Sequence, residues 1–489
     1  MNVTAQNPNA FKKKLPFLFV VVVLLFAALA CGFLSSAAQT GIGAVLAFIV
    51  YLVFCVYMSQ RAATSFIILS PLIFLRATEI YAGIPIEFGT YIEEITTYGA
   101  PTGSTGRLAA FYIFCFYVCS IVIEPFWARI KTDYLNRFSN LKINPYVFWG
   151  FTSVVLAGTA YMIFFGLTRG FPLLENYDRF NYARDNADLI YQQWMANRYL
   201  SAFFLGIFYA SKKHRLLAMG MTGMILVTSV LFAEKFTSIS LILILVAMPS
   251  ALLYIARHRI LPIRRIVMYP AIILALTLPL VFVVYGGLDD DKDAMQGLLT
   301  RMASQGELWH AVDARYASFA YVKYEVLARD MTTWVDLSKQ DTQSMGTDIG
   351  LYYLMDHVAP ADVTKGQVER GTGYVFSLFP YILMISGWVG LIVFGVLTHL
   401  IFVVLMLSVV YQFSKLNFIN LILCSRLFVM MLSGGFVGGY LWFFFGLKTF
   451  IFFGIIFMID AFMRIATVRQ RSTPRLRPGP AVERPQRPN

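Results

Sequence analysis

The feature that most constrains this chain is the series of long apolar runs along its 489 residues. Twelve runs, the sixth of them short, are candidates to cross about 30 Å of hydrocarbon as helices. They cover 15–34, 41–58, 63–81, 107–125, 146–167, 198–211, 216–232, 236–255, 266–285, 388–411, 417–433 and 440–463. We therefore expect an all-α polytopic membrane protein with about twelve transmembrane helices.

Composition supports this fold class and excludes others. Apolar residues make up 58% of the chain and charged residues 14%, against about 25% charged in soluble proteins. One soluble domain of this size cannot bury so much apolar surface. A soluble enzyme, a secreted disulfide scaffold and a nucleic-acid-binding module are excluded, so we expect no nucleic-acid partner.

Charge predicts the orientation of the spans. Three lysines, Lys12 to Lys14, precede the first run, so the positive-inside rule places the N-terminus in the cytoplasm. Alternation then puts most Lys and Arg of the short loops inside. The loops 168–197 and 286–373 fall outside, and the second holds most of the outside acids.

These assignments divide the chain into four parts. Residues 1–285 hold spans one to nine with the short outer loop 168–197. Residues 286–373 form a large outer loop that we expect to be mostly helical. Residues 374–465 hold a re-entrant or interfacial helix and the last three spans, and the Pro- and Arg-rich segment 466–489 reads as a disordered cytoplasmic tail.

The shorter outer loop carries the first candidate site. Its arginines Arg169, Arg179 and Arg184 alternate with aromatic residues, and Gly170 and Pro172 predict a turn where the helix leaves the membrane. Arginine suits phosphate oxygens because its planar fork makes two parallel bonds. The alternative is that these arginines pair with the loop's own acids, Glu175, Asp178, Asp185 and Asp188.

The larger outer loop carries candidates for a general base. We expect a helix over 298–330, on which Glu307 and His310 share a face and Asp313 orients the imidazole. A His310 base near its reference pKa would lose activity below about pH 6. Arg301 and Arg315 flank this cluster as further phosphate ligands. The alternative is a solvated helix face held by salt bridges.

Charges inside the apolar runs need a reason. Arg76 and Glu79 are three residues apart and are expected to pair, while Arg426 and Lys448 stand without an evident partner. Such residues line a substrate path or form a buried structural ion pair. Arg426 is included among the candidate phosphate ligands.

Metals and cofactors are not expected. The acidic run at 289–293 lacks the later bidentate Glu of an EF-hand, so a solvated turn is the simpler reading. The five cysteines, Cys31, Cys55, Cys115, Cys119 and Cys424, sit inside apolar runs without zinc-type spacing.

The motifs resemble a known family. The segment Arg169-Gly-Phe-Pro-Leu-Leu with Arg179 after it, and the segment Phe379-Pro-Tyr…Gly387-Trp-Val-Gly390, are similar to those of Wzy-type O-antigen and exopolysaccharide polymerases. The repeated Arg-x10-Gly motif of some members is absent from both outer loops. The resemblance implies a GT-C-like glycosyltransferase in the bacterial inner membrane, with its active site facing the periplasm.

What the resemblance implies about chemistry is specific. The substrate would be an oligosaccharide on undecaprenyl diphosphate, the acceptor a hydroxyl of the next repeat unit, and the leaving group a lipid diphosphate. Membrane lipids, a chain-length regulator and a flippase would be the partners. Two alternatives stay open: an O-antigen ligase that transfers the glycan to lipid A–core, and a transporter or flippase of the lipid-linked oligosaccharide.

Overall fold

The computed structural model describes residues 8–472 except 140, 176–178, 212, 235, 259–260, 263–298, 301, 317–320, 337–345 and 371–374. The described chain is helical apart from one two-stranded antiparallel hairpin. Its elements are α1 (Pro8–Ala38), α2 (Ile42–Arg61), α3 (Ala63–Glu87), β1 (Tyr91–Ile92), β2 (Thr97–Tyr98), α4 (Ser104–Ser139), α5 (Pro145–Arg169), α6 (Arg179–Asn186), α7 (Leu189–Ala210), α8 (Arg215–Leu231), α9 (Phe236–His258), α12 (Glu307–Tyr316), α13 (Tyr324–Val335), α14 (Gly350–Val358), α15 (Ala361–Arg370), α16 (Leu378–Lys415), α17 (Phe418–Val429), the π-helix η2 (Met430–Val437), α18 (Trp442–Phe445) and α19 (Leu447–Ser472).

Nine helices of the described chain are long and apolar enough to cross a membrane. They are formed by α1, α2, α3, α4, α5, α9, α16, α17 continued by η2, and α18 continued by α19. The expected fold class, an α-helical polytopic membrane protein, is confirmed in this coarse form.

The expected count of twelve is not confirmed. The run 198–211 belongs to α7. The first half of this helix is polar, so the helix as a whole is not apolar enough to be a candidate membrane span. The run 216–232 belongs to α8, which has 17 residues and covers only about 26 Å at 1.5 Å per residue. The run 266–285 lies outside the described residues.

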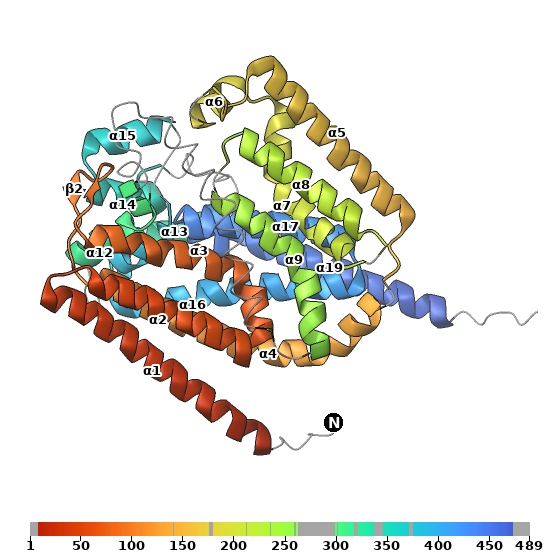
Figure 1. The fold of residues 1–489 in the computed structure, drawn as a ribbon, viewed down its shortest axis with the longest axis horizontal. Coiled ribbons are helices and arrows are strands. Elements are labelled where there is room, and N and C mark those ends of the chain that lie inside the picture. The colour runs from red at the N-terminus through yellow and green to blue at the C-terminus, as the bar shows by residue number, and fades with distance from the viewer. Residues whose placement is uncertain are drawn as a thin grey trace, which may run out of the picture.

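The helices form two groups that share α9 and α17 as connectors (Figure 1). In the first group α1 packs on α2 and α4, α3 packs on α2 and α4, and α16 packs along α4. In the second group α7 packs on α8 and α9, and α5 packs on α8. Helix α9 also contacts α3 and α4, and α17 joins α16 to α7.

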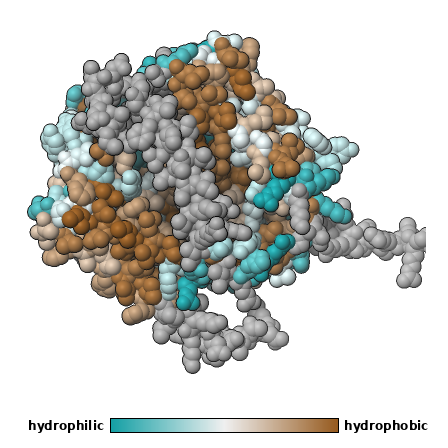
Figure 2. Space-filling view, in the orientation of Figure 1, coloured by the Kyte–Doolittle hydropathy of each residue, from teal (hydrophilic) through white to brown (hydrophobic). Residues whose placement is uncertain are grey.

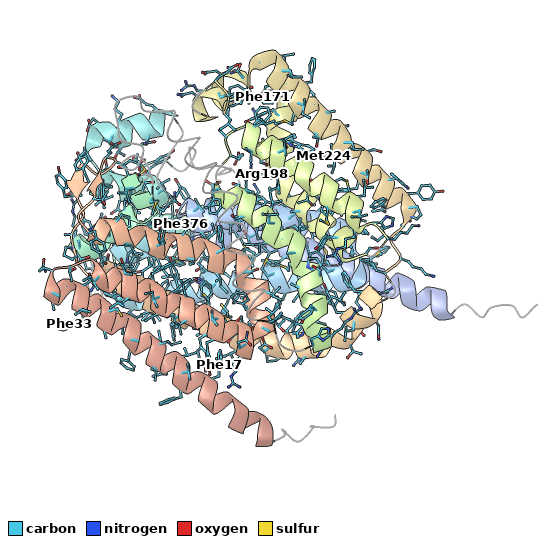
Figure 3. The ribbon with its side chains drawn as sticks, viewed as in Figure 1. Phe17, Phe33, Phe171, Arg198, Met224 and Phe376 are labelled. Carbon is cyan, nitrogen blue, oxygen red and sulfur yellow. The ribbon has the colours of Figure 1, made fainter. Side chains whose placement is uncertain are left out.

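The outer face of the first group is apolar. Phe19, Phe26 and Phe33 of α1 are 69%, 68% and 74% exposed, and a brown surface covers α1 and α2 in Figure 2. The labelled Phe17 and Phe33 mark the two ends of this face in Figure 3. A surface of this kind is stable against lipid tails and unstable in water.

The large segment 286–373 contains the helices α12 to α15 and a short helical stretch before α12, rather than one long helix over 298–330. A turn at 304–306 precedes α12, and residues 321–323 before α13 are not helical. Gly306 explains the first break: it lies in the turn, and a Cβ there would stand 3.3 Å from the backbone oxygen of Glu79. The turn seats α12 closely on α3.

The segment that precedes the tenth expected span contains a kink. Residues Leu378 to Ser386 form a short buried helix, and Gly387 has φ 63° and ψ −170° before the long helix continues to Lys415. That backbone conformation is nearly exclusive to glycine. The kink lets the short helix lie under α14 and α12, both of which contact α16.

Candidate functional site

The segment between α5 and α7 is folded against the second helix group. Helix α5 ends at Arg169 because Gly170 has a φ of 80°, which confirms the predicted turn. The Tyr182 hydroxyl of α6 donates a 2.8 Å hydrogen bond to the Gly170 carbonyl. Asp188 caps α7 by accepting the Tyr191 N–H at 2.8 Å. A small buried cluster, consisting of Met162, Phe165, Tyr182, Tyr191 and Phe232, holds these ends together.

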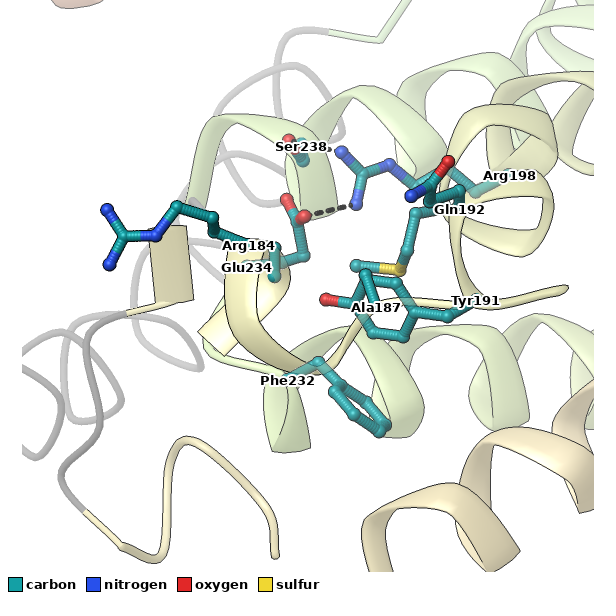
Figure 4. A pocket seen from close by; sticks show the side chains of 10 residues that line it. Arg184, Ala187, Tyr191, Gln192, Arg198, Phe232, Glu234 and Ser238 are labelled. Atoms are coloured by element: carbon teal, nitrogen blue, oxygen red, sulfur yellow. Dashed lines mark hydrogen bonds and ion pairs between the residues drawn. The ribbon is translucent and has the colours of Figure 1, made fainter. Parts of the chain in front are cut away.

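A cavity of about 600 Å³ lies beside this cluster (Figure 4). Its walls include Arg184 of α6, Tyr191 and Arg198 of α7, and Ser238 of α9. Glu234, from the connection between α8 and α9, completes its charged lining. The cavity is open to the exterior rather than enclosed.

Arg198 and Glu234 are the partly buried charges of this cavity. The Arg198 Nη1 atom is 2.8 Å from Glu234 Oε1, and their side chains are 13% and 17% exposed. Arg198 Nη2 also donates to Ser238 Oγ at 3.4 Å, and the guanidinium lies over the Tyr199 ring at 5.4 Å. A cation and a carboxylate thus face the same cavity.

Arg184 is at the rim. Its side chain is 59% exposed and its Nε lies 3.1 Å from Asp185 Oδ1, and in Figure 4 it extends away from Arg198. The sequence left two alternatives open for the loop arginines, a ligand site or ion pairs with the loop's own acids. Arg184 fits both, because it lines the cavity and also pairs with Asp185.

The other predicted phosphate ligands are not gathered at this cavity. Arg169 is exposed, lies over the Phe165 ring and donates to the Asn186 carbonyl at 3.4 Å. Arg315 is exposed at the end of α12 and donates to the Val358 carbonyl at 3.3 Å. Arg426 is exposed on α17. The side chain of Arg179 and the whole of Arg301 lie outside the described residues.

The three predicted catalytic residues share one buried face of α12. Glu307, His310 and Asp313 are 0%, 6% and 5% exposed, so the alternative of a solvated helix face is wrong. His310 Nδ1 lies 3.3 Å from Ser104 Oγ and 3.5 Å from Thr102 Oγ1. Burial lowers the pKa of His310 to about 4. An acid limb caused by His310 would therefore fall near pH 4 rather than pH 6.

The sequence predicted that Asp313 orients His310, but in the structure Asp313 has a different partner. Its carboxylate accepts Arg107 Nε at 2.9 Å and also pairs with Arg107 Nη2, which makes a bidentate ion pair between α12 and α4. Burial raises the pKa of Asp313, and the bonds from Arg107 oppose that rise. The pair fixes α12 on the bundle.

Glu307 faces a different, acidic cavity. This cavity has a volume of about 190 Å³, and its lining includes Glu93, Glu94 and Ser304 as well as Glu307. Helix α12 contacts α3, α4, α14 and α16, whereas α6 and α7 belong to the second group (Figure 1). The structure therefore separates the expected base cluster from the expected arginine cluster.

Sequence reasoning missed several charged groups that the structure buries wholly or in part. Arg198 and Glu234 stand at the ends of apolar runs, and that position was the available signal. Asp330 of α13 is fully buried and accepts a hydrogen bond from the Tyr381 hydroxyl. Burial raises the pKa of Asp330 to about 7. Its sequence neighbourhood, an amphipathic helix, gave no such indication.

In the described part of the chain, no three His, Cys, Asp or Glu side chains are placed so that they could hold a metal ion together. The acidic run 289–293 lies outside the described residues. All five cysteines are free thiols.

Comparison with known proteins gives one match. A family model described as "Family of unknown function (DUF6418)" matches residues 344–453. The matched stretch runs from the start of α14 into α19 and includes the Gly387 kink and η2. No curated protein and no solved structure matches the chain.

Proposed function

We propose that this protein is a membrane glycosyltransferase that polymerises oligosaccharide repeat units carried on undecaprenyl diphosphate, at the periplasmic face of the inner membrane. The observation that carries the proposal is the open cavity of about 600 Å³ that is lined by the partly buried pair Arg198 and Glu234 and has Arg184 at its rim. A diphosphate needs cationic donors, and Arg198 is held in place by its contacts with Glu234, Ser238 and Tyr199.

The chemistry assigns one role to each charge. The acceptor hydroxyl oxygen forms a bond to the anomeric carbon, and the bond from that carbon to the diphosphate oxygen breaks. The electron pair leaves with the lipid diphosphate, which Arg198 and Arg184 stabilise. The hydroxyl proton passes to the Glu234 carboxylate. Glu307, His310 and Asp313 then serve to seat α12 rather than to accept this proton.

The test uses purified protein, the lipid-linked repeat unit and gel analysis of the product. Arg198→Ala is expected to lower the rate by about 10²-fold or more, the scale for one preorganised donor. Arg198→Lys rescues poorly because lysine lacks the bidentate fork. Glu234→Gln is expected to lower the rate by about 10²–10⁴-fold. EDTA is expected to leave the activity intact.

Arg215→Ala is the matched control, because this exposed arginine at the start of α8 contacts Tyr209 and does not line the cavity. Full activity in both Arg198→Ala and Glu234→Gln would remove the cavity from the reaction. In cells, loss of a polymerase leaves single repeat units on the core, whereas loss of a ligase leaves none. That pattern separates the two activities.

A further inference from the structure

A second charged cluster is buried between α3, α4, α16 and η2. Arg76 and Glu79 of α3 and His399 of α16 are 0%, 1% and 0% exposed. Arg76 Nη1 donates to Glu79 Oε2 at 2.8 Å, as predicted from their spacing. The Tyr112 hydroxyl of α4 donates to the same carboxylate oxygen.

Aromatic rings enclose both the guanidinium and the imidazole. The Arg76 guanidinium lies 5.1 Å from the Tyr112 ring centroid, 4.7 Å from that of Phe379 and 4.9 Å from that of Phe436. The His399 ring lies 6.4 Å, 5.3 Å and 5.4 Å from the same three rings. Arg76 and His399 therefore occupy one aromatic compartment, which we call the Arg76 compartment.

Several polar atoms of this compartment have no hydrogen-bond partner in the described chain. They are Nε and Nη2 of Arg76, Oε1 of Glu79 and Nε2 of His399. His399 Nδ1 is 2.7 Å from the Gly395 carbonyl, so Nδ1 carries the proton and Nε2 is an acceptor. The compartment thus offers one unpaired donor edge, formed by Nε and Nη2, and two unpaired acceptors.

Other polar groups that face this cluster are already engaged or are weak partners. The Tyr51 hydroxyl of α2 donates to the Ile73 carbonyl at 2.9 Å. Cys115 of α4 supplies only a thiol. Gly306, in the turn before α12, lies against the Glu79 carbonyl, and Glu307 of α12 lines its own cavity. Phe436 is the side chain that η2 places against Arg76.

We propose that the Arg76 compartment binds an internal water molecule that bridges Arg76, Glu79 and His399. Water accepts from the free Arg76 edge and donates to Glu79 Oε1 and His399 Nε2, which matches the unpaired donors and acceptors. Buried water typically makes about three such bonds.

The test is X-ray radiolytic labelling of the full chain in lipid nanodiscs, because hydroxyl radicals formed from bound water oxidise the nearest rings. Phe379 and Phe436 should be labelled several-fold faster than Phe203. All three are 0% exposed, but Phe203 packs on Phe413 and Phe428 instead of polar groups. Equal rates at the three rings would show a dry compartment and overturn the proposal.

His399→Phe removes one acceptor and fills space, so it should lower the labelling of Phe379 toward that of Phe203. His214→Phe is the matched control, because His214 contacts Phe148 far along the chain from this compartment and should leave Phe379 labelling unchanged. Unchanged labelling in folded His399→Phe would contradict the inference. If that variant does not fold, the labelling rates of Phe379, Phe436 and Phe203 in the wild-type protein still test the proposal. This readout is independent of glycosyl transfer.

Discussion

His310 and Asp330 are both buried, and burial shifts the pKa of each in the direction that disfavours its charged form. The pKa of His310 falls to about 4 and that of Asp330 rises to about 7. Each shift links protonation to folding, but with opposite sign. The two effects overlap between about pH 4 and pH 7, so the pH profile of the wild-type protein hides both. Single variants are needed to separate them.

For His310 the folded state resists protonation while the unfolded chain takes up a proton near pH 6.5. As the pH falls from 7 to 4, the wild-type protein should lose about 3 kcal/mol of unfolding free energy relative to His310→Gln. The measurement is denaturant unfolding of both proteins in detergent across this range. A difference that stays constant with pH would contradict the burial of a neutral imidazole.

For Asp330 the folded state holds the proton and the unfolded chain releases it near pH 4. Relative to Asp330→Asn, the wild-type protein should lose about 4 kcal/mol of unfolding free energy as the pH rises from about 4 to 8. Asparagine keeps the acceptor for the Tyr381 hydroxyl, so packing changes little. The same unfolding assay checks this, and an opposite slope would show that Asp330 is ionised in the folded protein.

Sequence reasoning at this scale could predict local pairs but not distant ones. Arg76 and Glu79 are one helical turn apart, so their ion pair follows from spacing. Asp313 is also one turn from His310, yet it pairs with Arg107, which is 206 positions away in the chain. A partner that tertiary packing brings into place leaves no periodic signal in the sequence.

Elements were predictable where a long apolar run or a strong turn residue sets them. The membrane helices and the turn at Gly170 belong to this class. The break at 304–306 was not predictable, because it depends on the seating of Gly306 against α3. Helix α7 was predicted only in part. Its apolar second half was recognised as a possible span, but its polar first half forms a wall of the cavity.

The Gly387 kink gives a test at the scale of one helix. Gly387→Ala places a Cβ on a backbone with φ 63° and ψ −170°, so it should cost about 1–3 kcal/mol. Gly454→Ala in α19 is the control: Gly454 has open space around its Cβ position, and alanine there should be neutral or stabilising by about 1 kcal/mol. Denaturant unfolding in detergent measures both. Equal effects would show that the kink is not strained.

At the scale of the whole molecule, the arrangement of the two helix groups decides which loops can share a site. The sequence places Arg184 and His310 in two loops on the same predicted side of the membrane. The structure puts α6 in the second group and α12 on the first, against α3, α4 and α16. Which loops meet depends on how helices pack across hundreds of residues, and single-chain hydropathy does not contain that information.

The orientation of the bundle is the last prediction. Lys142 lies just before α5 and Asp185 lies after it, in α6. Both side chains are exposed, and one candidate span separates them. The positive-inside rule puts Lys142 in the cytoplasm and the Arg198 cavity in the periplasm. In intact cells, with the five native cysteines replaced, a membrane-impermeant thiol reagent should label Asp185→Cys from outside. Lys142→Cys should react only after the inner membrane is opened. The reverse pattern would place the cavity in the cytoplasm, where a lipid-linked glycan exported to the periplasm cannot reach it.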